Sequence, residues 1–202
     1  MLRSLARAAG LTGVCVLLRV QTHRRIPNVS FSTFICSGDT INPMNGIRNY
    51  LQNNVFSKEP RSAVSLLRAF LIGVGMALAW GLVSGLFHLD ELFSDTAVRQ
   101  MFSRPLPYQI VFYGVVSPLA EELLFRLILF DLVRKVVPER VAALIVAALF
   151  ALWHGNIIQM LYAFPAGLIL QYLRKRSGGM EEPVLCHIGA NLASIIVSAL
   201  VS

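Results

Sequence analysis

Residues 69–87 contain no charged side chain and are long enough to cross a bilayer as one helix. The rest of the chain agrees with this feature, since 55% of the 202 residues are hydrophobic, only 14% are charged and the mean hydropathy is +0.63. Soluble domains of this length are markedly more polar. The sequence therefore predicts an integral membrane protein.

Four more apolar segments follow, and together they predict an all-α, polytopic membrane helix bundle of about five transmembrane helices. The segments are residues 106–133, 141–153, 157–173 and 183–201. In the fifth, Pro183 suits the first turn of a helix, where its missing N–H is not needed.

The basic residues support this count, because positive charge collects in the loops on one side of a membrane. With five spans, nine basic residues share the side of the mature N-terminus. The opposite side receives only two, and acidic neighbours offset their charge. The nine are Lys58, Arg61, Arg68, Arg134, Lys135, Arg140, Arg174, Lys175 and Arg176; the two are Arg99 and Arg104, beside Asp90, Glu91 and Asp95.

The net charge of +7 does not favour nucleic acid as a partner, because few aromatic residues lie among the basic ones. Membrane lipid and a protein or peptide substrate in the membrane are the expected partners. Cys15, Cys36 and Cys186 are too scattered for a disulfide framework or a Cys-x-x-Cys metal site.

Residues 1–38 contain basic residues and no acidic residue, which is typical of an organelle transit peptide. A secretory signal with its apolar core at 11–18, or a plain basic arm, is the alternative. The mitochondrial inner membrane is the favoured location, and the endoplasmic reticulum or a bacterial-type plasma membrane is the alternative. Residues 39–63 read as a polar linker, 64–105 as the first transmembrane helix with its loop, and 106–202 as the functional core.

Three ionisable residues, Glu121, Glu122 and Arg126, lie inside the second apolar segment. Each costs roughly 2.5 to 3.5 kcal/mol in a membrane span and needs a reason to be there. Glu122 and Arg126 are four residues apart and can pair on one helix face, whereas Glu121 points about 100 degrees away. Glu121 is therefore either a functional carboxylate or a group kept protonated or in a watery crevice.

Two histidines and an asparagine lie in the apolar half beside this glutamate. His154 follows Phe150 by four residues and His187 precedes Asn191 by four, so each pair shares a helix face. Alone, each is more often a structural residue. Together with Glu121 they suggest chemistry: Glu121 and His154 could deprotonate a water, and His187 and Asn191 could stabilise an oxyanion.

A covalent nucleophile is not evident, since neither Ser117 nor Cys186 lies in a nucleophile motif. On straight spans Glu121 and His154 lie at the same depth, and His187 is displaced from them by about 10 Å. A tilted helix, or an incomplete fourth helix near Gly155 and Pro165, has to close that gap.

Three sequence motifs occur in a fixed order, one in each of three apolar segments. They are Glu-Glu-Leu-Leu-Phe-Arg from Glu121, Phe-Ala-Leu-Trp-His from Phe150 and His-Ile-Gly-Ala-Asn from His187. In this respect the chain from about residue 106 resembles the CAAX protease and bacteriocin-processing (Abi) family of intramembrane endopeptidases, and is similar to type II CAAX prenyl endopeptidase.

The resemblance implies a peptide hydrolase in which Glu121 is the catalytic base and His154 its partner. It implies that His187 and Asn191 form the oxyanion site, with Glu122, Arg126 and Phe150 in support. It requires no cofactor. Zinc remains possible, with Glu121, His154 and His187 as its ligands.

Two other classes of function remain open from the sequence. One is a non-catalytic membrane scaffold or chaperone that retains the motifs for packing. The other is a small ion or metal transporter that uses Glu121, His154 and His187 as an ion site. Cleavage of a substrate that depends on Glu121 separates the endopeptidase from both.

Overall fold

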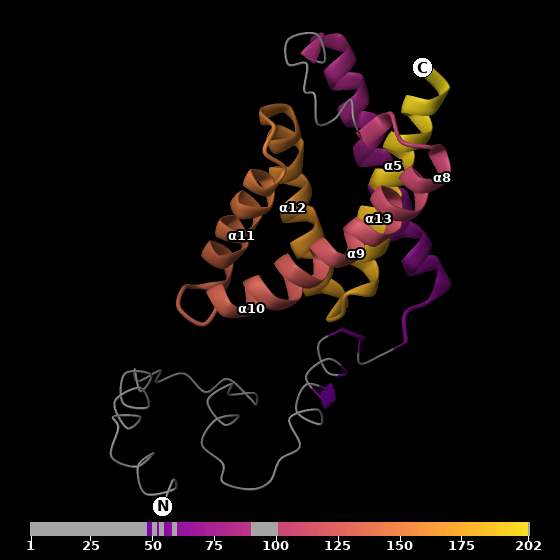
Figure 1. Cartoon of the computed structure of the whole chain (residues 1–202). Helices are drawn as coiled ribbons and strands as arrows, with labels where there is room; N and C mark the ends of the chain where they lie inside the picture. Colours follow the sequence, from indigo (N-terminus) through magenta and orange to yellow (C-terminus); the bar gives the residue numbers. More distant parts are fainter. Residues whose placement is uncertain (1–47, 50–51, 53–54, 58–59, 90–100, 202) are drawn as a thin grey trace, which may run out of the picture. The chain divides into compact units, whose positions relative to one another are not determined.

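A computed structural model describes residues 48–49, 52, 55–57, 60–89 and 101–201, and within these residues it consists of helices without strands. Five long helical segments follow one another (Figure 1), so the predicted all-α bundle is confirmed. The predicted transit peptide at 1–38 and most of the predicted linker lie outside the described residues. The five segments are α5 (Ala63–Leu86), a composite helix (106–133), α11 (Glu139–Trp153), α12 (Ile157–Ser177) and α13 (Glu181–Val201).

Local capping residues set the ends of these helices more than hydropathy does. Ser62 accepts a hydrogen bond from the backbone N–H of Ser65, so α5 begins at Ala63, earlier than the apolar run. Asn156 accepts from the first backbone N–H groups of α12. Gly178 ends α12 with a φ of 67°, a left-handed conformation that glycine adopts without strain.

The composite helix is continuous but changes its winding along its length. It consists of α8 (Leu106–Tyr108), the π-helical η1 (Gln109–Val116), α9 (Ser117–Glu122), the π-helical η2 (Leu123–Leu129) and α10 (Phe130–Val133). Pro118 follows η1; it lacks an N–H and crowds the carbonyl of the preceding turn, which favours wider winding there. Glu121 and Glu122 therefore lie on a short α-helical piece between two π-helical ones.

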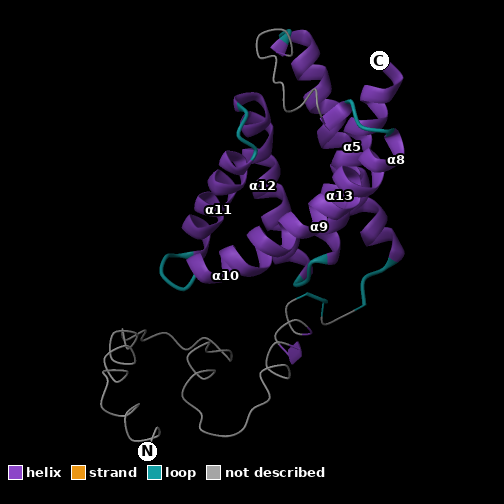
Figure 2. Ribbon diagram, viewed as in Figure 1, coloured by secondary structure: helices purple, strands orange, loops and turns teal. Residues whose placement is uncertain are grey.

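Helix α13 packs against α5, against η1 and α9 of the composite helix, and against α12. Figure 2 shows the all-helical arrangement around it. The contact with α5 is very close: a Cβ on Gly73 would lie 1.8 Å from the backbone oxygen of Cys186, and one on Gly189 would lie 2.4 Å from that of Phe70. Small residues that let two backbones approach are the usual contact between membrane helices.

The outer surface of α5 carries large apolar side chains. Leu82 and Leu86 are exposed over 65% and 68% of their surface, and only Ala69, Gly73 and Ser84 of this helix are buried. Among the described residues, α5 and α13 are long and apolar enough to cross a membrane, by length and composition alone. With 15 residues, α11 is shorter than the roughly 20 that a bilayer core requires.

Candidate active site

Glu122 and Arg126 form a fully buried ion pair in the composite helix. The Nη1 atom of Arg126 lies 3.2 Å from Oε1 of Glu122, and both side chains are at most 1% exposed. Arg126 also donates through Nη2 to the carbonyl of Gly167 at 3.3 Å and lies over the ring of Phe150, 4.2 Å from its centroid. The pairing predicted from the four-residue spacing is thus confirmed.

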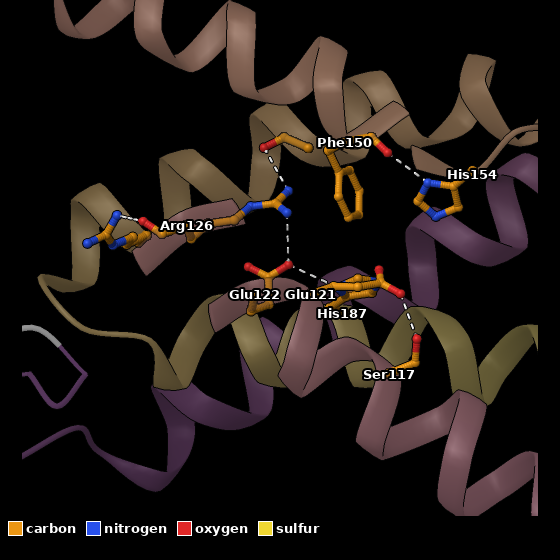
Figure 3. A network of polar contacts seen from close by, with 9 residues as sticks. Ser117, Glu121, Glu122, Arg126, Phe150, His154 and His187 are labelled. Carbon is orange, nitrogen blue, oxygen red and sulfur yellow. Dashed lines mark hydrogen bonds and ion pairs between the residues drawn. The ribbon is translucent and has the colours of Figure 1, made fainter. Parts of the chain in front are cut away.

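His187 of α13 lies between the two adjacent glutamates. Its Nδ1 is 2.9 Å from Oε1 of Glu122, and its Nε2 is 3.7 Å from Oε2 of Glu121 (Figure 3). A carboxylate can only accept a hydrogen bond, so Nδ1 donates to the ion-paired Glu122. That bond fixes the orientation of the ring and turns Nε2 toward Glu121.

Glu121 is held at one oxygen only. The hydroxyl of Ser117, one turn earlier, donates to Oε1 at 2.6 Å. Oε2 is buried and accepts no hydrogen bond in the described part of the chain. A buried acceptor without a donor is costly and rare, and Oε2 of Glu122 is in the same state.

The two adjacent acidic side chains of this cluster have different partners. Glu122 is fully buried and pairs with the buried Arg126. The side chain of Glu121 is 16% exposed, and its Oε2 faces Nε2 of His187. The cation Arg126 therefore serves Glu122, whereas Glu121 faces a histidine.

His154 lies at the end of α11, and its ring is fixed by the backbone. Its Nδ1 is 2.8 Å from the carbonyl oxygen of Phe150, so Nδ1 donates and Nε2 of the neutral ring keeps its lone pair. The ring of Phe150 lies between the two histidines, edge-on to each, with centroids 4.9 Å from His154 and 5.6 Å from His187.

A cavity of about 40 Å³ joins three of the sequence-predicted site residues, His154, His187 and Asn191. Asn191 donates one N–H of its amide to the carbonyl of Tyr113 at 2.8 Å, which leaves its second N–H for another acceptor. Polar groups line the cavity on several sides, and its volume exceeds the roughly 15 Å³ that a water requires. The cavity can hold a water between a base and hydrogen-bond donors.

A comparison with protein families finds a match for the part of the chain that carries this candidate site. Residues 103–193, which carry all three motifs, match the family described as type II CAAX prenyl endopeptidase Rce1-like. The resemblance that the motifs indicated is thus confirmed over residues 103–193. The family is membrane-embedded, which agrees with the two span-length helices among the described residues.

The chain is also similar to a curated relative, the "Uncharacterized 24.3 kDa protein" of Escherichia coli. The two are 30% identical over 139 residues, which cover 66% of this chain and 59% of the relative. The chain thus spans less than two thirds of the length of that protein. No solved structure matches.

Within the Rce1-like segment, His187 rather than His154 is the direct neighbour of Glu121. No hydrogen bond or ion pair joins Glu121 to His154 among the described residues, although both histidines line the same cavity. The expected depth gap of His187 is closed, because the composite helix runs obliquely across α13 (Figure 1). Ser117, set aside as a nucleophile, emerges as the partner of Glu121, and its position four residues earlier could have shown this.

The predicted zinc ligands do not form a metal site here. Glu121 and His187 are close together, but no group of three His, Cys, Asp or Glu side chains in the described residues is placed to hold a metal ion. The residue types suit zinc, whereas their positions in this structure do not.

Proposed function

We propose that this chain is a CAAX-type intramembrane endopeptidase in which Glu121 activates the water that attacks a peptide bond. The observation that carries the proposal is the unsatisfied Oε2 of Glu121, which faces Nε2 of His187 across 3.7 Å, while His187 itself lines a water-sized cavity. The match to the Rce1-like family supports a peptide substrate that is reached from the membrane.

The first step is attack by water. The carboxylate of Glu121 takes one proton from the water, and Nε2 of His154 accepts a hydrogen bond from it and holds it in the cavity. The hydroxide oxygen bonds to the carbon of the scissile carbonyl, and the electron pair of the C=O bond moves onto the carbonyl oxygen. Ser117 keeps Oε1 of Glu121 in place, so that Oε2 remains directed at the water.

The second step is collapse of the tetrahedral intermediate. His187, protonated at Nε2, and the second amide N–H of Asn191 donate hydrogen bonds to the negative oxygen. The C=O bond re-forms, the C–N bond breaks, and the leaving nitrogen takes the proton held by Glu121. The buried Glu122 and Arg126 keep His187 oriented through both steps.

The direct test is cleavage of a farnesylated CAAX peptide by the full-length protein in lipid nanodiscs. We expect release of the last three residues by the wild type and none above background by Glu121→Ala at equal membrane level. The unprenylated peptide is the control for substrate class. Turnover that survives in Glu121→Ala would overturn the mechanism, and equal cleavage of both peptides would overturn the CAAX-type specificity while leaving a peptide hydrolase.

We also propose the mitochondrial inner membrane as the location, on the strength of the acid-free composition of residues 1–38. A carboxy-terminal tag on the full chain should co-fractionate with inner-membrane markers. Co-fractionation with endoplasmic reticulum markers would contradict this location.

A further inference from the structure

A second cavity, of about 300 Å³, lies away from the proposed catalytic residues at the basic end of the bundle. It opens where α10 ends, α11 begins and α12 ends, and its size is near the lower limit of roughly 300 to 1,000 Å³ for ligand pockets. Three cations, Arg134, Arg174 and Lys175, line it together with Glu139 and Gln171.

The positive charge of this cavity exceeds the negative charge around it. Asp131 pairs with both Arg134 and Arg174, at 3.1 and 3.2 Å, and Glu139 pairs with Lys175 at 2.9 Å. Three cations and one carboxylate, Glu139, thus line the cavity, and Asp131 lies next to it. Arg174 is held firmly, since it also donates to the backbone carbonyl of Arg126, whereas Arg134 and Lys175 are about half or more exposed and can turn to a ligand.

The side chain of Gln171 sets a second and independent requirement on any ligand of this cavity. Its side chain is only 7% exposed and lines the cavity, yet its Oε1 atom accepts no hydrogen bond within the described residues. Such an acceptor needs a donor. A fully deprotonated anion cannot supply one, so a fitting ligand combines a negative group with an N–H or O–H donor.

The position of the cavity suggests where such a ligand comes from. The helix ends around it carry the clustered basic residues that mark the membrane–water boundary, and basic pockets between membrane helices on that side suit lipid head groups. We propose that this cavity binds the head group of a glycerophospholipid, with its phosphodiester at the basic side chains and its N–H or O–H donor at Oε1 of Gln171.

Two lipids of equal charge separate these requirements. Phosphatidylethanolamine and phosphatidylcholine share a phosphodiester, but the trimethylated ammonium of choline has no N–H to donate. Native mass spectrometry of the full-length protein, titrated with each lipid in detergent, should give a Kd about fivefold lower for phosphatidylethanolamine, the value expected for one hydrogen bond. Gln171→Leu should abolish this preference.

The charge requirement is tested at the exposed Lys175, where a substitution does not disturb the core. Lys175→Ala should weaken binding of both lipids severalfold, and Lys175→Arg should retain it. Arg140→Ala is the matched control, because Arg140 is a basic residue of the same region that does not line the cavity.

Three results would overturn the proposal. Equal affinity of the wild type for the two lipids removes the role of Gln171, and an equal effect of Arg140→Ala and Lys175→Ala reduces the binding to diffuse surface charge. Displacement of bound lipid by inorganic phosphate alone, at concentrations matched to the lipid, would identify a free-anion site. Loss of prenyl-peptide cleavage has no bearing on any of these outcomes.

Discussion

Helix α13 presents two neighbouring faces that are built on opposite principles. Toward α5 it offers Cys186 and Ala190, which are buried and approach the backbone around Gly73. Toward the composite helix it offers His187 and Asn191, each hydrogen-bonded across the interface. The first, which we call the packing face, depends mainly on close approach of the backbones, with a hydrogen bond from Ser65 of α5 to Glu182 of α13. The second, which we call the polar face, contacts the buried ion pair of Glu122 and Arg126. The contrast separates the closest helix contact from the candidate active site.

The largest loss of stability is expected on the polar face, from removal of the charge of Arg126. Arg126→Leu leaves the buried carboxylate of Glu122 without its cation, so the free energy of unfolding should fall by about 3 to 5 kcal/mol. Denaturation in detergent measures this. The double variant Glu122→Leu/Arg126→Leu removes both charges and should lose less than the single one. A single variant as stable as the wild type would show that the pair does not matter to folding.

A substitution at Gly73 should disrupt the packing face, with a smaller loss of stability. A methyl group there meets the backbone of Cys186, so Gly73→Ala should force α5 and α13 apart and cost about 1 to 3 kcal/mol of stability. Gly75→Ala is the matched control: a Cβ at Gly75 meets nothing within 4 Å, and alanine favours a helix by up to about 1 kcal/mol. Equal behaviour of the two variants in thermal unfolding would contradict the close approach.

The smallest effect is expected on the polar face, at the hydrogen bond between Ser117 and Glu121. Ser117→Ala removes the hydrogen bond that holds Oε1 of Glu121, so kcat for the prenylated peptide should fall about tenfold while KM stays constant, as expected for one bond to a charged group. Ser194→Ala is the control, since that hydroxyl bonds only to its own helix at Ala190. A change in KM alone would assign Ser117 to substrate binding instead.

The sequence predicted the helices well, because an apolar segment of span length has few other ways to satisfy its backbone. It placed the second segment correctly at residues 106–133. It placed the start of α5 too late, because a cap such as Ser62 adds a turn that hydropathy does not register. The π-helical winding of η1 and η2 could not be predicted from the spacing of apolar residues.

The site was predicted in part. The spacing of Glu122 and Arg126 gave their pairing, since both lie on one helix. The approach of His187 to Glu121 depends on the angle between two helices, which side-chain packing sets and local sequence does not. Gln171 gave no signal, because one amide in an apolar segment looks like ordinary helix contact until its oxygen is found without a donor.

We propose that the two adjacent glutamates have different roles, Glu121 in the chemistry and Glu122 in the structure. The most direct test measures kcat and Tm together for Glu121→Gln and Glu122→Gln. We expect Glu121→Gln to lower kcat by about 10²- to 10⁴-fold, as for loss of a general base, with Tm unchanged, and Glu122→Gln to lower Tm. Turnover that persists in Glu121→Gln, or that falls only as far as its folded fraction does, would show that Glu121 is not the general base.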